Sequence, residues 1–492
     1  MPRSKLLVTL VVVLIGAATL WYMWMLVSAK LELGGASPDR QTLGYVQETQ
    51  QRAMTQYCTG VVATPQGTWL VGRVEARSNL LPAAPEALDL DALVYGKAGE
   101  PQEEEGSGAF ASLMQPREKE VSFISRLDAN GQFQRIAQVG EVACLVASPD
   151  GSSVFLLTGL KRPQTAGRDD AIGQTVVLRS DDQGKSWTWL RQGLFPQVEQ
   201  LAEYLRPYFH GPDEIWALGT PSGLDNEDGT DRPGAIATGL FYSADRGASS
   251  TPIVAAESLL VPAEYAHGTR PEVREWHSGD PYGEIRNHVV QLDAQRAVLW
   301  VSQRFWGSHP DGVSDHIAAT VTTRAQLQRS GGHWQVTSVQ REDGLYVDAL
   351  DDNGAGRIVG VIDQGAGSRD RVAELDTTTF AWRVLSELPS VFAPLASDSH
   401  LRGGNFWVGR NSLVVNTWSE HRPPRWLYGW SDASISASAT FYSKDWGQSW
   451  QRLDIAGYLG TLGFQGAEDR VIWAKGNWYD SNDLGVYSYG LQ

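Results

Sequence analysis

The chain has 492 residues, 42% of them hydrophobic, and 41 basic against 57 acidic side chains give a formal net charge of −16. This composition supports a buried core and excludes a mainly disordered chain. The acidic balance argues against a nucleic-acid-binding protein, whose affinity rests on Lys and Arg contacts to phosphates. Two cysteines exclude a disulfide-rich scaffold. The 51 Gly, 19 Trp and 16 Tyr favour an all-β fold of short strands.

The N-terminus predicts a membrane-spanning helix. Leu6 to Val27 carry no charge, and Arg3 and Lys5 precede them. As a helix this segment reaches about 33 Å, enough to cross a ~30 Å hydrocarbon core. The basic residues keep the N-terminus in the cytoplasm, which places the bulk of the chain on the periplasmic side of the inner membrane. A cleaved signal peptide, cut after Ala29, is the alternative.

The expected organisation has three parts: a signal anchor over residues 1–30, a linker over residues 31–40, and an exported all-β domain over residues 41–492.

Within the exported domain, seven segments predict a β-hairpin, each a strand, a short polar turn and a second strand. The turns are expected at Gln66-Gly67, Asp150-Gly151, Pro212-Asp213, Ala294-Gln295, Asn353-Gly354, Arg410-Asn411 and Gly466-Ala467. A second hairpin lies between most neighbouring pairs. Seven repeats of two hairpins predict a seven-bladed β-propeller with four strands per blade, and six blades with insertions is the alternative. A strand within residues 41–56 is expected to complete the last blade.

A turn motif recurs three times in these second hairpins. The copies begin at Ser180, Ser243 and Ser443, which lie 63 and 200 residues apart. The residues that define them are Ser180, Asp182, Gly184 and Trp187; Ser243, Asp245 and Gly247; and Ser443, Asp445, Gly447 and Trp450. The Asp side chain can accept hydrogen bonds from nearby backbone amides, and Gly supplies a positive φ. The second copy has Ser250 where the others have Trp.

This motif, S-x-D-x-G-x-[ST]-W, resembles the Asp-box (BNR repeat) of the sialidase-like β-propellers. The resemblance implies a propeller in which these turns are structural and lie away from the functional site. It does not imply sialidase activity here. Sialidases of this superfamily carry an Arg-Ile-Pro motif and an arginine triad, and no Arg-Ile-Pro occurs in this sequence. Asp-box propellers also include proteins that dock other proteins, such as photosystem assembly factors and sortilin-type receptors.

The two cysteines fit the predicted blades. Aligning Val62–Pro65 with Val146–Pro149 places Cys58 and Cys144 on inner strands of adjacent blades. We expect a disulfide between them outside the cytoplasm, and two buried thiols are the alternative.

A functional site is expected on the propeller face that carries the longer connections, because binding residues often lie on loops of a rigid scaffold. The longest predicted connections are Arg73–Lys119, Leu160–Ile172, Thr220–Ala237, Glu257–Asn287, Arg304–Asp315 and Ser419–Ser438. Two of them place aromatic side chains beside Arg and His, as in sugar-binding platforms and protein-binding hot spots. These candidate binding residues are Arg304, Trp306, His309, His421, Arg422, Arg425, Trp426, Tyr428 and Trp430.

No cofactor is expected. Asp225, Glu227, Asp228 and Asp231 offer oxygen ligands for calcium, but their spacing does not match an EF-hand loop. His267, His277 and His288 show no HExxH spacing, so a zinc site is not predicted.

The sequence therefore predicts a membrane-anchored exported propeller that binds a protein, in assembly of an envelope complex or in neutralising a partner such as a toxin. The alternative is a glycoside hydrolase acting on an extracytoplasmic glycan. Such an enzyme needs two carboxylates ~5–5.5 Å apart for retention or ~6.5–9.5 Å apart for inversion. The candidates for that pair are Asp280, Glu284, Glu420 and Asp432, and we favour the binding protein over an enzyme.

Overall fold

The computed structural model describes most of the propeller and the N-terminal helix. The described residues are 3–30, 41–46, 61–76, 87–90, 93, 119–139, 143–159, 175–190, 194, 206–218, 239–255, 258–262, 275–276, 283–308, 315–353, 355–364, 370–423, 434–453, 462–475 and 484–491.

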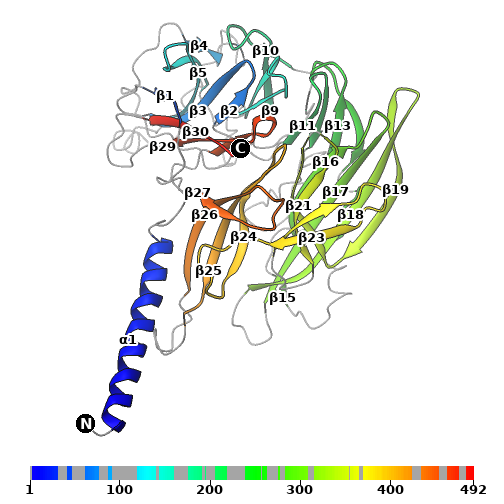
Figure 1. The fold of residues 1–492 in the computed structure, drawn as a ribbon. Coiled ribbons are helices and arrows are strands. Elements are labelled where there is room, and N and C mark those ends of the chain that lie inside the picture. The colour runs from blue at the N-terminus through cyan, green and yellow to red at the C-terminus, as the bar shows by residue number, and fades with distance from the viewer. Residues whose placement is uncertain are drawn as a thin grey trace, which may run out of the picture.

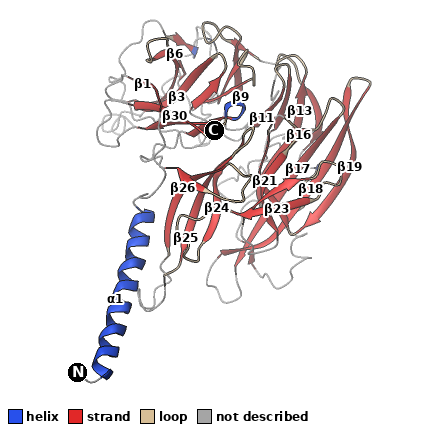
Figure 2. Ribbon diagram, viewed as in Figure 1, coloured by secondary structure: helices blue, strands red, loops and turns tan. Residues whose placement is uncertain are grey.

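Seven antiparallel sheets form a seven-bladed β-propeller, as predicted (Figures 1 and 2). Blade 1 contains β2 (Val61–Thr64), β3 (Gly67–Ala76), β5 (Lys119–Leu127) and β6 (Phe133–Val139), with β4 (Leu88–Asp89) added parallel to β6. Blade 2 contains β7 (Ala143–Ala147), β8 (Val154–Gly159), β9 (Thr175–Ser180) and β10 (Thr188–Trp189). Blade 3 contains β11 (Arg206–His210), β12 (Glu214–Leu218), β13 (Gly239–Ser243) and β14 (Thr251–Ala255).

The other four blades follow the same order. Blade 4 contains β16 (Glu284–Gln291), β17 (Arg296–Ser308), β18 (Asp315–Ser330) and β19 (His333–Asp343), and β15 (Glu275–Trp276) also pairs with β17. Blade 5 contains β20 (Leu345–Asp352), β21 (Ile358–Gln364), β22 (Arg371–Leu375) and β23 (Trp382–Glu387). Blade 6 contains β24 (Asp398–Val408), β25 (Leu413–His421), β26 (Ile435–Ser443) and β27 (Gln451–Leu453). Blade 7 contains β28 (Leu462–Gln465), β29 (Arg470–Lys475), β30 (Leu484–Gly490) and β1.

The ring is closed by the N-terminal strand. β1 (Gln41–Val46) pairs antiparallel with β30, from Gln41 opposite Ser488 to Val46 opposite Leu484. The last blade therefore takes its outermost strand from the start of the domain, as predicted, and the six-blade alternative is wrong. Closure of this kind places strands from both ends of the propeller domain in one sheet.

Several predicted loop boundaries are wrong, because strands of blades 4 and 6 extend further than expected. Pairing between β17 and β18 continues to Ser308 opposite Asp315, so Arg304 lies on a strand. Glu284 begins β16, where His288 also lies, rather than a loop. β25 continues to His421, which pairs with Ile435 of β26. The seven predicted hairpin turns are confirmed.

The core lies within and between the blades. First strands of neighbouring blades contact one another, β2 with β7 and β28, and β20 with β16 and β24, so they surround the centre of the ring. Large buried side chains such as Trp69, Trp216 and Trp300 fill the spaces between sheets. One apolar cluster, for example, joins Val298 and Trp300 of blade 4 to Val347 and Ile362 of blade 5.

The three S-x-D-x-G-x-S turns share one hydrogen-bond pattern. In the first, the Ser180 hydroxyl donates to Asp182 (2.9 Å) and accepts from the Gly184 amide (2.7 Å). The Ser186 amide also donates to Asp182 (2.9 Å). The turns at Ser243 and Ser443 repeat these three bonds. Hydrogen bonds from the Ser186 hydroxyl and amide lower the pKa of Asp182.

Each of these turns packs on the preceding blade. Gly184 has φ +86°, and a Cβ there would lie 2.3 Å from Ile136 of β6. Gly247 faces Leu194, and Gly447 faces Ser386 of β23. The Trp187 ring is buried among side chains of blades 1 and 2. The turns therefore fasten blade 2 to blade 1, blade 3 to the segment after blade 2, and blade 6 to blade 5.

A single helix, α1 (Arg3–Lys30), precedes the propeller and projects away from it (Figure 1). Its segment Thr9–Ser28 has a mean hydropathy of 2.2, and within the described part of the chain it is the one helix long and apolar enough to cross a membrane. Most of its apolar side chains are exposed, including Leu10, Leu14 and Leu20.

Candidate functional site

The two faces of the ring differ in their connections. The turns within hairpins lie on one face, which we call the turn face. On the other face, the loop face, the first and third strands of each blade begin and the second and fourth end. The beginning of β16, β20 and β24 and the end of β17, β21 and β25 therefore lie on the loop face of blades 4–6.

Charged side chains gather at this end of blades 4–6. Arg286 donates to Glu284 (Nη2–Oε1, 2.9 Å) and to Asp348 (Nε–Oδ1, 3.3 Å). Arg304 lies opposite Glu284 in the β16–β17 ladder. We call the following residues the loop-face cluster: Glu284, Arg286, Arg304, Tyr346, Asp348, Asp363, Asp370 and His400. Four carboxylates and two guanidinium groups make this cluster acidic.

Arg304 is the central cation of the cluster. Its guanidinium nitrogens lie 3.8 Å from Glu284, 3.8 Å from Asp363 and 4.0 Å from Asp370, too far for good hydrogen bonds. Its Cζ lies 4.0 Å from the centre of the Tyr346 ring. The residue is only 8% exposed, and among the described residues Nε and Nη2 have no hydrogen-bond partner. Buried donors in this state can still donate a hydrogen bond to a water or a ligand oxygen.

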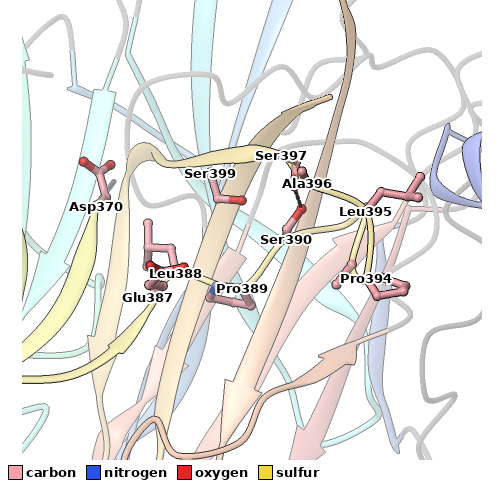
Figure 3. A pocket seen from close by; sticks show the side chains of 11 residues that line it. Asp370, Glu387, Leu388, Pro389, Ser390, Pro394, Leu395, Ala396, Ser397 and Ser399 are labelled. Atoms are coloured by element: carbon pink, nitrogen blue, oxygen red, sulfur yellow. Dashed lines mark hydrogen bonds between the residues drawn. The ribbon is translucent and has the colours of Figure 1, made fainter. Parts of the chain in front are cut away.

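Asp370 connects the cluster to a pocket. One of its carboxylate oxygens lies 3.4 Å from Nδ1 of His400 and accepts a hydrogen bond from the Leu401 amide (3.2 Å). The same residue lines a cavity of about 450 Å³ between blades 5 and 6, at the segment that joins β23 to β24 (Figure 3). The Ser390 and Ser397 hydroxyls form a hydrogen bond across it.

The pocket lining is acidic. The lining residues are Asp370, Glu387, Leu388, Pro389, Ser390, Ala393, Pro394, Leu395, Ala396, Ser397 and Ser399. They include two carboxylates, and no basic side chain is among the described residues that line the cavity. A pocket of this chemistry favours a cationic group.

Burial and neighbouring charges shift the pKa values of several groups in the cluster. Burial raises the pKa of Asp348 to about 6, with Arg286 opposing and Asp370 reinforcing that shift. The contact with Asp370 raises the pKa of His400 against the effect of burial. Burial also raises the pKa of Tyr346 well above its usual value. Asp348 therefore changes its protonation state at a pH near neutral, whereas Tyr346 stays protonated there.

Of the predicted catalytic candidates, only Glu284 lies in the cluster. Glu420 is on β25 of blade 6, where Nε of Arg422 lies 3.9 Å from it and the Arg422 side chain is 81% exposed. Asp280 and Asp432 lie outside the described residues. The predicted pair of facing carboxylates therefore stays a prediction.

One of the predicted binding residues lies in the loop-face cluster, some lie elsewhere, and some are outside the described residues. Arg304 lies in the cluster, and Trp306 pairs with Ile317 on β17 and β18. His421 is buried at the end of β25 rather than exposed. Its Nδ1 lies 2.6 Å from the Ala396 carbonyl, and its Nε2 lies 2.7 Å from the Tyr22 hydroxyl of α1. Five predicted residues lie outside the described part of the chain: His309, Arg425, Trp426, Tyr428 and Trp430.

The candidate calcium and zinc ligands lie only in part within the described residues. The loop with Asp225, Glu227, Asp228 and Asp231 lies outside the described residues. Within the described ranges, no group of three or more His, Cys, Asp or Glu side chains is arranged to hold a metal ion.

Cys144, at the beginning of β7, is disulfide-bonded. The other cysteine of the sequence, Cys58, lies outside the described residues, so its pairing with Cys144 stays a prediction.

Sequence reasoning missed Asp348, Asp363, Asp370 and His400, although a signal was present for two of them. Asp348 interrupts the apolar run of β20, and Asp363 ends the apolar run of β21. A carboxylate in the buried part of a strand is unusual and marks a candidate site. The approach of Asp370 and His400 from different blades had no local signal.

Comparisons with known proteins return similar folds only. No family model and no curated protein sequence matches the chain. A prolyl endopeptidase matches with 12% identity and a TM-score of 0.39 over 76% of this chain and 47% of that one. The acylaminoacyl peptidase of Pyrococcus horikoshii has 9% identity and a TM-score of 0.40, over 88% and 51%. The sialidase of Trypanosoma rangeli has 14% identity and a TM-score of 0.30, over 74% and 56%. The chain thus spans about half the length of the first of these structures.

Proposed function

We propose that this protein is a membrane-anchored propeller that binds a protein partner on its loop face, through a basic side chain inserted beside Asp370. The observation that carries the proposal is the acidic pocket between blades 5 and 6, which adjoins a buried cluster with more carboxylates than guanidinium groups. A cationic group entering the pocket gains attraction in a region of low dielectric. The overall charge of −16 steers basic partners toward the protein.

Anchoring is the second part of the proposal. α1 holds the propeller at the periplasmic surface of the inner membrane, supported by its length, its apolar exposed surface and the basic residues of its first turn. An anchored receptor meets other membrane-bound proteins at a raised effective concentration. Anchoring supports a role in assembly of an envelope complex or in neutralising a protein that acts at that membrane.

We also propose that the three S-x-D-x-G-x-S turns are Asp-boxes with a structural role. Their shared hydrogen bonds and their packing on the preceding blade support that assignment.

The experiment is affinity purification of the tagged full-length protein from detergent-solubilised membranes of its own host, read by quantitative mass spectrometry. Ala396→Phe fills the pocket from an exposed lining position, and Ala248→Phe makes the same change on the turn face as the matched control. We expect a near-stoichiometric partner that Ala396→Phe and Asp370→Asn lose and Ala248→Phe keeps. Full retention by both pocket variants contradicts the proposed site.

Glycoside hydrolysis is a second candidate function, and the pKa of Asp348 favours it. A carboxyl group with a pKa of about 6 keeps its proton to a higher pH than an ordinary Asp, as the general acid of a glycosidase does. Release of reducing sugar from envelope glycans by the wild type, lost in Asp348→Asn, would establish the enzyme. No release by the wild type leaves binding as the function.

A further inference from the structure

The end of α1 is seated on blade 6. Leu26 is 4% exposed and belongs to the same buried apolar cluster as Val391 and Phe392, while its neighbour Val27 is 43% exposed. Tyr22, one helical turn earlier, also packs against that cluster. The helix therefore contacts the propeller through one face of its last turns, and the side chains on its other faces remain exposed.

A polar link fixes this contact. His421 lies between the Ala396 carbonyl and the Tyr22 hydroxyl. A carbonyl only accepts hydrogen bonds, so Nδ1 of His421 donates to Ala396. In a neutral ring Nε2 is then an acceptor, and the Tyr22 hydroxyl donates to it. The Tyr22 and His421 rings also meet edge to face, with centroids 5.8 Å apart.

These contacts are all at the loop face. His421 ends β25, and Ala396 lies in the segment before β24 that also lines the pocket. From there α1 runs away from the propeller beyond the ends of these strands (Figure 1).

The length of the helix leaves little space between the propeller and a bilayer. The residues from Leu6 to Trp21, before the seated turns, number 16. They span about 24 Å as a helix, less than the ~30 Å hydrocarbon core that they must cross. The seated turns therefore complete the crossing, and Tyr22 and Leu26 lie near the boundary between the hydrocarbon core and the interfacial layer, where Trp and Tyr are favoured.

We infer that blade 6 is a docking surface for Tyr22 and Leu26, and that this contact holds the loop face of the propeller against the membrane surface. The inference rests on the anchoring role of α1 in the proposed function. It also narrows the partner class. A ligand of the pocket must approach along the membrane surface, as a basic segment next to a transmembrane helix of an integral membrane protein does.

The test compares two ends of one strand in the full-length protein, reconstituted in nanodiscs whose lipids carry a nitroxide on the head group. Ser434→Cys places a fluorophore before β26 on the loop face, and Gln448→Cys places it in the turn after β26; both positions are exposed. β26 separates them by roughly 30 Å. We expect several-fold stronger quenching at position 434. Equal quenching, or stronger quenching at position 448, overturns the inference.

A second pair of variants tests the docking itself. Leu26→Ser removes the buried contact, and Val27→Ser makes the same change on the exposed face of the helix. Leu26→Ser, combined with Tyr22→Phe, should reduce quenching at position 434 to the level at position 448, and Val27→Ser should leave it unchanged. Unchanged quenching in the double variant contradicts the docking. Alkaline extraction of membranes separates the two proposals, because release of the wild type refutes anchoring itself.

Discussion

The charged side chains of the turn face are well hydrogen-bonded, whereas several of those of the loop face are buried and poorly paired. On the turn face, Asp182 and Asp445 accept hydrogen bonds from hydroxyl and amide groups of their own turn, and their pKa values are lowered. On the loop face, Nε of the buried Arg304 has no hydrogen-bond partner among the described residues, and Asp348 has a raised pKa. Polar groups that are satisfied locally hold the fold together. Polar groups that stay buried and poorly paired have a cost in stability, which function can explain.

The largest expected effect compares the two ends of β17. Arg304→Ala leaves several carboxylates buried without their central cation, so we expect a loss of about 3–5 kcal/mol in the free energy of unfolding. Arg296 at the turn-face end forms an exposed pair with Asp293 (2.7 Å), and Arg296→Ala should cost less than about 1 kcal/mol. Denaturant unfolding measures both. Similar losses for the two variants would remove the distinction between the faces.

The glycine of a turn-face motif should also matter through packing. Gly184→Ala puts a Cβ at positive φ and against Ile136, so we expect a loss of about 2–4 kcal/mol. Gly211→Ala is the control, because Gly211 has φ +76° and no atom lies within 4 Å of a Cβ built there. Its loss should be about 1–2 kcal/mol, from backbone strain alone. Equal melting temperatures for the two variants would contradict the packing of the turn on blade 1.

The pH dependence of stability should reveal the loop-face cluster. The pKa of Asp348 is about 6 in the folded protein against 3.8 ordinarily, so the folded state holds this proton more tightly. Its contribution is fully present below pH ~4 and is lost as the pH rises through ~6, by at most about 3 kcal/mol. Asp348→Asn should remove that decline. Denaturant unfolding of the wild type and of Asp348→Asn at pH 4.5 and pH 7.5 measures this decline. If both proteins lose the same free energy of unfolding between the two pH values, Asp348 is not the group responsible.

The smallest expected effects come from the individual turn carboxylates. Asp182→Asn and Asp445→Asn each weaken hydrogen bonds within an exposed turn, so each should cost about 1 kcal/mol. Closely similar losses are expected because the two turns share their bonds. A much larger loss at one of them, in the same unfolding measurement, would give that turn a role beyond the fold.

More of the fold than of the site could be predicted, because the sequence patterns that mark a blade involve residues close together in the chain. Hairpin turns and the S-x-D-x-G-x-S motif depend on neighbouring residues, and even the closing strand β1 followed from counting strands. The site depends on contacts between blades. Arg304 was selected for its aromatic neighbours, but Asp363 and Asp370 reach it from blade 5, and His400 of blade 6 contacts Asp370. His421 was expected at a binding surface, and only the structure brings Tyr22 to it across 399 positions of sequence.

The central claim is that the loop face binds the partner, and in-cell photo-crosslinking tests it most directly. A photoreactive amino acid replaces Ala396 on the loop face or Ala248 on the turn face of the full-length protein, both exposed positions. The account predicts one dominant adduct from position 396, with an integral membrane protein, and none from position 248. A dominant adduct from position 248 alone, or no adduct from position 396, would contradict it.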